Sequence, residues 1–285
     1  MAAPAPIVDD LRTVHLTSGP LRYRDSGGNG APLVFVHGVF VNGLVWRQVV
    51  PPLAARFRCI VPDVPLGAHA VPMFPQANQT PPGLAALLLE FVAALGLTGV
   101  TLIGNDTGGA LCQLAIAKDP DAAARLVLVN CDSYEHFFPP SLQAFAILPA
   151  VPGFTWLFTR LVAPYVARVA FATLVAKRIP ERAVLDSFFE PSYTNADVRR
   201  DLRRFLTSVS NRQTLAAART FAQFQKPVLI VWGVDDFFFP VSDGQRLANA
   251  FPNARFERIA DARTFVQEDQ PEALAALIAE FATQA

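Results

Sequence analysis

The chain has few cysteines, no excess of charge of one sign and no long apolar run, and each absence excludes a class of protein. Three cysteines among 285 residues cannot build a disulfide framework, and none has metal-ligand spacing. Basic and acidic residues number 24 each, so no net charge attracts nucleic acid or an anionic membrane. No uncharged apolar run reaches about 18 residues, so no membrane-spanning helix is predicted.

The first residues and the composition indicate the setting in which the protein works. Met1-Ala2-Ala3-Pro4 lacks the basic and apolar segments of a signal peptide, so we expect a cytoplasmic protein. Cys59, Cys112 and Cys131 are expected to be small buried hydrophobes. We expect the partner to be a small, largely apolar substrate, and we expect no nucleic acid, membrane, metal or cofactor. The protein could also form a homodimer.

Apolar residues make up 52% of the chain, enough for a large core, and their pattern alternates between strands and helices. This alternation predicts an α/β fold with a mostly parallel sheet. The expected strands are 14–16, 21–24, 33–36, 59–61, 100–103, 126–129, 228–232 and 255–259. The expected helices around them are 45–55, 84–95, 109–118 and 271–282.

Strand signals disappear between Asp132 and Phe224, where prolines, phenylalanines and helical periodicity dominate. We therefore predict a helical cap domain of residues 135–220, inserted after the sixth strand. Residues 1–134 and 221–285 form the predicted core domain, an eight-stranded sheet with helices on both faces. Apolar cap residues that face this core would line a substrate pocket.

The segment Gly104-Asn105-Asp106-Thr107-Gly108-Gly109 follows an apolar strand and precedes a helix. This is the layout of a nucleophile elbow, a sharp turn that exposes its central side chain above the sheet. The central residue is Asp106, whose carboxylate can attack carbon and form an ester with the protein. Asp106 is therefore the predicted catalytic residue.

Three features in this order resemble the α/β-hydrolase family: His37-Gly38 after the third strand, the elbow, and Gly233-Val234-Asp235-Asp236 after a late strand. The resemblance covers nearly the whole chain and implies the α/β-hydrolase fold with a cap. With an aspartate at the elbow, the chain resembles the haloalkane dehalogenases, fluoroacetate dehalogenases and epoxide hydrolases. Relatives with serine in that place are esterases and lipases.

The resemblance also implies roles for other residues. The backbone N–H groups of Val39 and Thr107 would form an oxyanion hole. Asp236, with Asp235 as the neighbouring candidate, would be the acid that orients a catalytic histidine, and Asp132 is a second place for that acid. Substrate contacts are expected from Phe40, Asn105, Asp132 and His136.

The catalytic histidine of the family has no counterpart in this sequence. In the family it follows the last strand, usually as Gly-His-Phe, and here that loop reads Asp261-Ala262-Arg263-Thr264-Phe265. Thr264 takes the place of the histidine and is predicted to act with Asp106 and Asp236. Arg263 stays charged and cannot take a proton, but it could pair with Asp236.

No histidine follows His136 in the chain, so the substitute bases are few. His136, at the start of the cap, is the best by location. His37 is expected to be structural, bonding the backbone around the oxyanion loop. His15 and His69 are expected at solvent-facing or loop positions.

Each family with an aspartate at the elbow has further typical residues, and this chain matches none of these sets. Haloalkane dehalogenases usually have tryptophan after the nucleophile and fluoroacetate dehalogenases arginine, whereas this chain has Thr107. Epoxide hydrolases usually continue His-Gly-x-Pro, where this chain has Phe40, and they use two cap tyrosines, for which Tyr165 and Tyr193 are candidates.

Three interpretations follow. The first is a hydrolase-family enzyme with divergent or weak hydrolysis of a small apolar ester, lactone, epoxide or halide, in which a water held by Asp236, Thr264 or Asp132 replaces the histidine. The second is a non-hydrolytic lyase, isomerase or cyclase of secondary metabolism, in which Asp106 is a general acid or base whose pKa is raised by burial. The third is a ligand-binding or partner-binding protein without catalysis.

Overall fold

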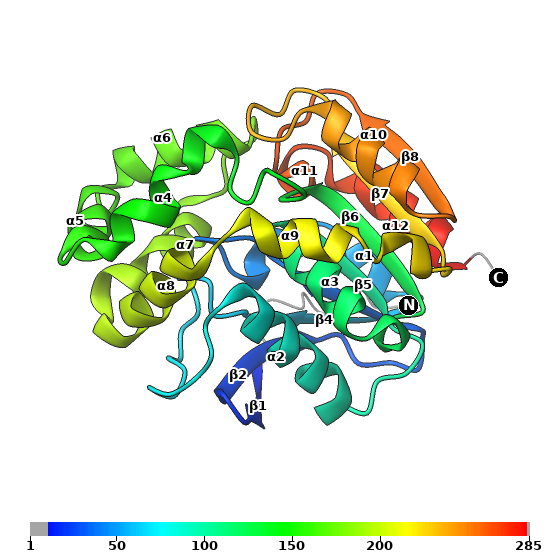
Figure 1. Ribbon diagram of the computed structural model, residues 1–285, viewed down its shortest axis with the longest axis horizontal. Coiled ribbons are helices and arrows are strands. Elements are labelled where there is room, and N and C mark those ends of the chain that lie inside the picture. Colours follow the sequence, from blue (N-terminus) through cyan, green and yellow to red (C-terminus); the bar gives the residue numbers. More distant parts are fainter. Residues whose placement is uncertain (1–10, 284–285) are drawn as a thin grey trace.

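A twisted eight-stranded sheet forms the centre of the molecule, in the order β1-β2-β4-β3-β5-β6-β7-β8 (Figure 1). The computed structural model describes residues 11–283, so the expectation about Met1–Pro4 lies outside the described residues. The strands are β1 Leu11–Leu16, β2 Gly19–Asp25, β3 Pro32–Val36, β4 Arg58–Pro62, β5 Thr101–Asp106, β6 Arg125–Cys131, β7 Val228–Gly233 and β8 Ala254–Ile259. Strand β2 runs antiparallel to β1 and β4, and all other neighbouring pairs are parallel, as predicted.

Alternate residues of each strand feed two separate apolar layers, because successive side chains point to opposite faces of a sheet. Val34 and Val36 of β3 belong to the layer under α2, α3 and α10, whereas Leu33 and Phe35 belong to the layer under α1 and α12. The core helices are η1 Gly43–Trp46, α1 Val50–Ala54, α2 Pro81–Ala94, α3 Thr107–Lys118, η2 Pro120–Ala122, η5 Phe221–Gln223, α10 Val241–Ala250, α11 Val266–Asp269 and α12 Pro271–Thr283. Helices therefore cover both faces of the sheet.

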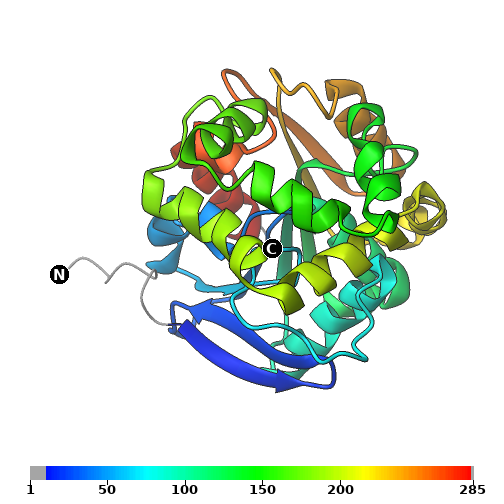
Figure 2. The same cartoon turned by 90° about the vertical axis from the view of Figure 1, so that its left-hand side faces the viewer.

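The segment between β6 and β7 is helical and lies mostly beyond the sheet (Figures 1 and 2). Its helices are η3 Pro140–Leu142, α4 Ala144–Ile147, η4 Leu148–Ala150, α5 Phe154–Leu161, α6 Tyr165–Val175, α7 Arg182–Thr194, α8 Ala196–Ser208 and α9 Asn211–Ala218. Helices α4 to α8 form the cap, whereas α9 returns to the core and lies against α3.

Two predicted helices have different bounds, and prolines explain both differences. The expected helix 45–55 is divided into η1 and α1, because Pro51 and Pro52 lack the N–H groups that would continue a helix through them. The expected helix 84–95 starts earlier, at Pro81, where Thr80 caps it by accepting the N–H of Gly83 at 3.2 Å. Proline suits the first turn because that turn has no intrahelical partner for its N–H groups.

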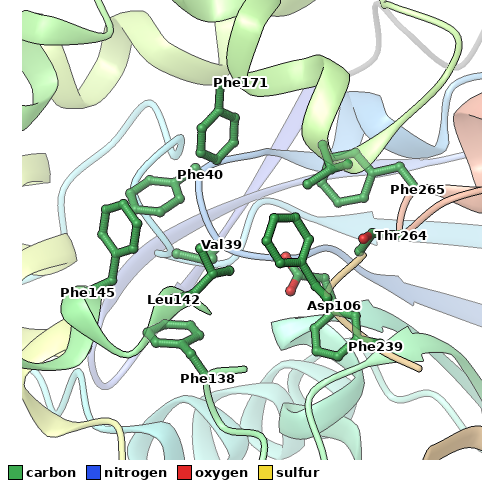
Figure 3. A pocket seen from close by; sticks show the side chains of 12 residues that line it. Val39, Phe40, Asp106, Phe138, Leu142, Phe145, Phe171, Phe239, Thr264 and Phe265 are labelled. Atoms are coloured by element: carbon green, nitrogen blue, oxygen red, sulfur yellow. The ribbon is translucent and has the colours of Figure 1, made fainter. Parts of the chain in front are cut away.

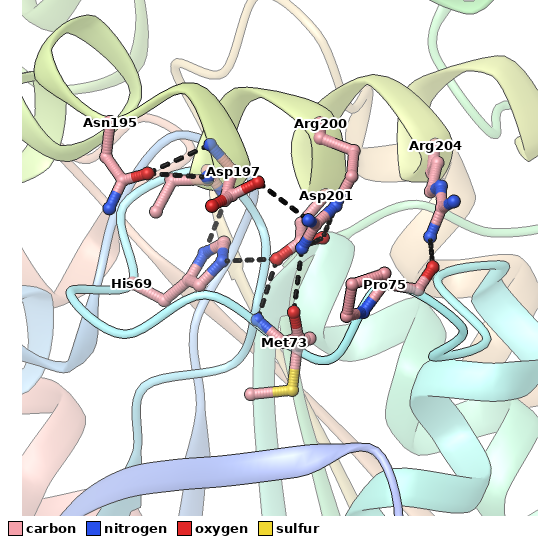
Figure 4. A network of polar contacts seen from close by, with 10 residues as sticks. His69, Met73, Pro75, Asn195, Asp197, Arg200, Asp201 and Arg204 are labelled. Carbon is pink, nitrogen blue, oxygen red and sulfur yellow. Dashed lines mark hydrogen bonds and ion pairs between the residues drawn. The ribbon is translucent and has the colours of Figure 1, made fainter.

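A buried polar network ties the cap to the core (Figure 4). His69 does lie in a loop, but it is buried and its Nε2 is 3.4 Å from Oδ2 of Asp201 on α8. The same oxygen accepts the backbone N–H of Met73 at 2.8 Å, and Arg200 reaches both Asp201 and the carbonyl of Met73. The loop between β4 and α2 is thereby fixed to the cap.

Candidate active site

The elbow forms where β5 ends at Asp106 and α3 begins at Thr107. Asp106 has φ 54° and ψ −132°, a backbone conformation that L-residues rarely adopt. A Cβ on Gly38 would lie 2.1 Å from Oδ2 of Asp106, so only glycine permits this close approach. The predicted turn is therefore present, and it holds the carboxylate directly against the loop after β3.

Two backbone N–H groups face the Asp106 carboxylate, those of Val39 and Thr107. Burial raises the pKa of Asp106 and is the largest influence on it; the two N–H groups lower it and the nearby charge of Asp236 raises it. The result is a pKa of about 7. The predicted oxyanion-hole donors thus converge on the predicted nucleophile, and near neutral pH its charged and protonated forms both occur.

The second carboxylate, Asp236, is surrounded by donors. Oδ1 accepts the hydroxyl of Thr264 at 2.8 Å and the N–H groups of Phe238 at 2.8 Å and Phe239 at 3.2 Å. Oδ2 accepts the amide of Asn130 at 2.6 Å. Burial still raises the pKa of Asp236, while these bonds oppose the rise. These four donors oppose the effect of burial and favour the anion of Asp236, whose charge in turn favours the protonated form of Asp106.

Thr264, the residue predicted to take the place of the histidine, contacts Asp236 and borders the cavity. Its side chain is buried, borders the same cavity as Asp106 and gives its hydroxyl proton to Asp236. Its carbonyl accepts the amide of Asn105 at 2.8 Å. The hydroxyl is therefore already used as a donor and is held by neighbours on both sides.

Asp132 lies one step deeper in the same region. It is fully buried, and Oδ2 accepts the hydroxyl of Thr107 at 3.0 Å while no partner is found for Oδ1 among the described residues. Burial, with the charge of Asp106, raises the pKa of Asp132 well above its usual range. A buried carboxyl with one donor is more stable protonated, so Asp132 is a neutral neighbour of the elbow and does not border the cavity.

The cavity above Asp106 is small and almost entirely apolar (Figure 3). It encloses about 40 Å³, room for a few water-sized groups. It is lined by Val39, Phe40, Asp106, Phe138, Leu142, Phe145, Phe171, Val175, Phe238, Phe239, Thr264 and Phe265. Asp106 and Thr264 supply its only polar side chains within the described chain, so a substrate enters a dry, aromatic environment next to one carboxyl group.

Phe40 makes the contact between core and cap that closes this cavity. Its ring centroid lies 5.6 Å from Phe145, 5.5 Å from Phe158 and 5.9 Å from Phe171, all of them on cap helices. Its φ of 64° turns the chain there. The sequence placed Phe40 correctly at the cavity, but nothing local in the sequence identified its cap partners.

Like Asp132, the predicted substrate contacts Asn105 and His136 do not border the cavity. The amide of Asn105 is buried under the elbow, where it donates to the carbonyls of Val129, Asn130 and Thr264 and accepts from Gln267 at 2.8 Å. It fixes three segments and does not border the cavity. His136 also lies off the cavity, with Nδ1 2.6 Å from Asp243 of α10.

The remaining candidates are occupied in other ways. His37 is fully buried with Nδ1 2.8 Å from the carbonyl of Gly38, and burial lowers its pKa to about 4, which suits the structural role expected for it. Arg263 does not pair with Asp236: it donates to the carbonyl of Thr173 and lies 4.5 Å from the ring of Phe237. In residues 11–283, no three side chains of the types that bind metals come together.

Sequence reasoning missed Asn130, which has a strong polar role at the site. Its side-chain N–H₂ donates to Asp236, and its side-chain oxygen Oδ1 accepts the N–H of Gly233 at 2.6 Å. Asn130 therefore connects the end of β6 to the loop after β7. A polar residue at the carboxyl end of a buried parallel strand was the available signal, because ligands of such sheets bind at that edge.

This fold and this elbow define a hydrolase-type scaffold. Residues 31–271 match the family model described as alpha/beta hydrolase fold, and the chain belongs to that family. It is 28% identical over 282 residues to haloalkane dehalogenase 2 of Mycobacterium tuberculosis, covering 92% of this chain and 91% of that protein. It is similar to an alpha/beta hydrolase fold protein from Burkholderia ambifaria, with 26% identity, TM-score 0.80 and coverage of 94% and 97%. The structure of a haloalkane dehalogenase from Bradyrhizobium elkani shares its fold, with TM-score 0.80, 19% identity and coverage of 96% and 97%.

Proposed function

We propose that this protein uses Asp106 to displace a leaving group from a small, mainly apolar substrate, and that it releases the resulting ester slowly. The observation that carries the proposal is the Asp106 carboxylate, which two backbone N–H groups orient at the mouth of a dry cavity. Similarity to haloalkane dehalogenase 2 supports a substrate with a carbon–halogen bond.

In the proposed step a carboxylate oxygen of Asp106 attacks a saturated carbon and forms a C–O ester bond. The carbon–halogen bond breaks and its electron pair leaves with the halide, so the step needs no proton donor. Attack on an ester or lactone carbonyl would create an oxyanion, and the N–H groups of Val39 and Thr107 already face Asp106 itself. The arrangement therefore favours attack at an alkyl carbon.

Opening an epoxide fits the cavity less well, because the departing oxygen needs a proton. The two tyrosines considered for that role do not border the cavity. Tyr165 is 41% exposed and lies 5.1 Å from the guanidinium of Arg182, while the ring of Tyr193 lies 4.7 Å from Arg160.

Hydrolysis of the ester is the slow step of the proposal. The Thr264 hydroxyl donates to Asp236, whose oxygens already accept four bonds, so neither residue is ready to take a proton from water. A general base typically contributes about 10²–10⁴-fold. Without one, the covalent ester accumulates during turnover.

One observation favours a second function, proton transfer without a covalent bond. The pKa of Asp106 is about 7 because of burial, which is the value an acid–base catalyst needs near neutral pH. In that case Asp106 would move a proton within a bound apolar substrate, as a lyase, isomerase or cyclase does.

Intact-mass spectrometry on the protein incubated with small haloalkanes, epoxides and p-nitrophenyl esters tests the proposal. We expect an adduct with haloalkanes that is absent in Asp106→Asn. Asp235→Asn is the matched control, since Asp235 pairs with Lys177 outside the cavity and its loss should leave the adduct unchanged. Product without an adduct would support proton transfer instead. Thermal stabilisation by a ligand with neither adduct nor product would leave only a binding protein and refute both functions.

A further inference from the structure

The outer side of the cap exposes many large apolar side chains that are not buried inside the protein. In the described chain, twelve large apolar side chains are exposed, and nine of them lie between Ile147 and Leu174. Six are at least half exposed, and we call these six the cap face: Ile147, Val151, Trp156, Leu157, Leu161 and Val166. They lie on or near α4, α5 and α6, and Figure 2 views the molecule from the side on which these helices lie.

The inward sides of the same helices are apolar as well. Phe145 of α4, Phe158 of α5 and Phe171 of α6 pack on Phe40 of the core. A helix with apolar residues all round is normally buried on all sides, but these helices are covered on one side only. Large apolar side chains exposed in such numbers on one segment indicate an interaction surface.

The charge around the cap face indicates the partner. None of the 24 acidic residues lies between Glu135 and Glu181, while this segment carries Arg160, Arg168, Lys177 and Arg178. Residues 135–220 as a whole contain eleven basic and six acidic residues, a net charge of +5 in a chain whose net charge is zero. The balance that argued against membranes for the whole chain therefore does not hold locally.

Not every one of these cations is available, and the ion pairs decide which are. Arg168 pairs with Asp186 and approaches Glu190, both of α7, and Lys177 pairs with Asp235 and Asp261 of the core. Arg160 makes no ion pair with a described residue, but its guanidinium donates to the hydroxyl of Tyr193 at 3.2 Å and lies 5.4 Å from the ring of Trp156. A cation therefore stands within the apolar cap face, beside an aromatic residue of the type that membrane interfaces favour.

We propose that the cap face docks on the surface of a bilayer containing anionic phospholipid. Its apolar side chains would enter the boundary between headgroups and acyl chains, and Arg160 would contact the phosphates. A second copy of this chain fits less well, because a symmetric contact would bring Arg160 and its surroundings against themselves. Nothing in the proposal depends on the reaction of Asp106.

The protein would lie on the bilayer without crossing it. Among residues 11–283, no single helix is long and apolar enough to span a membrane. Helices α5 and α6 together have the required length and composition, but they are bent by 95° relative to each other. Because of this bend the pair does not form one straight span, and we assign its exposed apolar side chains to an interfacial contact.

The chain contains its own probe for this contact. Trp46 and Trp232 are fully buried, whereas Trp156 is 52% exposed on the cap face. Vesicles of phosphatidylglycerol should shift the emission of Trp156 to shorter wavelength, and brominated acyl chains should quench it. Vesicles of phosphatidylcholine should do so far less, since each basic residue near an anionic surface strengthens binding about fivefold.

Co-sedimentation with the same vesicles gives the quantitative test. We expect Leu161→Glu and Val166→Glu, at positions 64% and 79% exposed, to weaken binding to phosphatidylglycerol at least tenfold. Phe74→Glu is the matched control, an exposed phenylalanine (44%) outside the cap whose loss should leave binding unchanged. Binding of the wild-type chain should also weaken as salt is raised.

Three results would overturn the proposal. One is the absence of binding to anionic vesicles by a folded wild-type protein with unshifted Trp156 emission. Another is a concentration-dependent dimer that Leu161→Glu dissociates, which would assign the cap face to a second copy. The third is binding that Phe74→Glu and Leu161→Glu weaken equally, because that would not locate the contact on the cap.

Discussion

Replacing Asp106 by asparagine should make the folded protein more stable at alkaline pH. Burial raises the pKa of this carboxyl from its ordinary 3.8 to about 7. The folded chain thus keeps the proton up to about pH 7, while the unfolded chain loses it near pH 4. Stability is therefore lost as pH rises through this interval, and the loss is complete above pH 7.

The interval between 3.8 and about 7 corresponds to about 4 kcal/mol. Because Asp106 is partly exposed where it borders the cavity, the expected effect is about 2–4 kcal/mol. Asparagine has the same shape, stays neutral, tolerates a positive φ and still accepts the N–H groups of Val39 and Thr107. Asp106→Asn should then exceed the wild type by about 2–4 kcal/mol at pH 8 and match it near pH 4.

Urea denaturation of wild type, Asp106→Asn and the control Asp235→Asn at pH 4, 6 and 8 measures this difference. Other buried acids, Asp132 and Asp236 among them, titrate in all three proteins, so the difference isolates Asp106 and its coupling to them. If Asp106→Asn gains nothing at pH 8, or gains equally at every pH, the raised pKa is wrong. The proton-transfer alternative would then lose its support.

Three further predictions concern the site and the cap. Thr264→His should place a base beside Asp236 and raise hydrolysis of the ester about 10²–10⁴-fold in steady-state assays, and a folded variant without this gain would contradict the assigned place of Thr264. Gly38→Ala should reduce adduct formation at least about 10²-fold, because its methyl group would lie 2.1 Å from Oδ2 of Asp106; unchanged adduct kinetics by mass spectrometry would count against the elbow geometry. Asp201→Asn should destabilise the protein by about 3 kcal/mol in urea, since it breaks a buried ion pair, whereas the exposed Asp197→Asn on the same helix should lose less than about 1 kcal/mol. Equal losses for these two variants would mean that the buried network does not hold the cap.

The sheet was predictable from sequence because its strands are short apolar runs bounded by turn residues. All eight expected strands are present, and so is the helical segment between β6 and β7. The elbow was predictable for a similar reason, since a strand, a small-residue turn and a helix follow one another within a few residues. These signals lie within a few neighbouring residues, so they can be read without knowing the tertiary structure.

Contacts between segments that are far apart in the chain could not be predicted from the sequence. Asn130 and Asp236 are 106 positions apart, and only the pairing of β6 with β7 brings them to 2.6 Å. Burial of His69 likewise depends on Asp201, 132 positions away on a cap helix. His69 lies in a loop, which was one of its two expected settings, but its burial was not foreseen because nothing nearby in the sequence indicates a carboxylate from the cap.

The surroundings of Asp236 indicate whether this site is a hydrolase site that has lost its histidine or a site built to work without one. If a histidine had simply been lost, Asp236 would remain as a buried carboxylate with an empty place in front of it, which is strongly destabilising. Instead Thr264 fills that place and donates to Asp236, while Asn130 and two backbone N–H groups satisfy its other lone pairs. The anion is complete without a histidine, and its charge helps to raise the pKa of Asp106 to about 7. Asp236 therefore acts here on Asp106 directly: its negative charge adds to the larger effect of burial in raising the pH at which that carboxyl becomes charged.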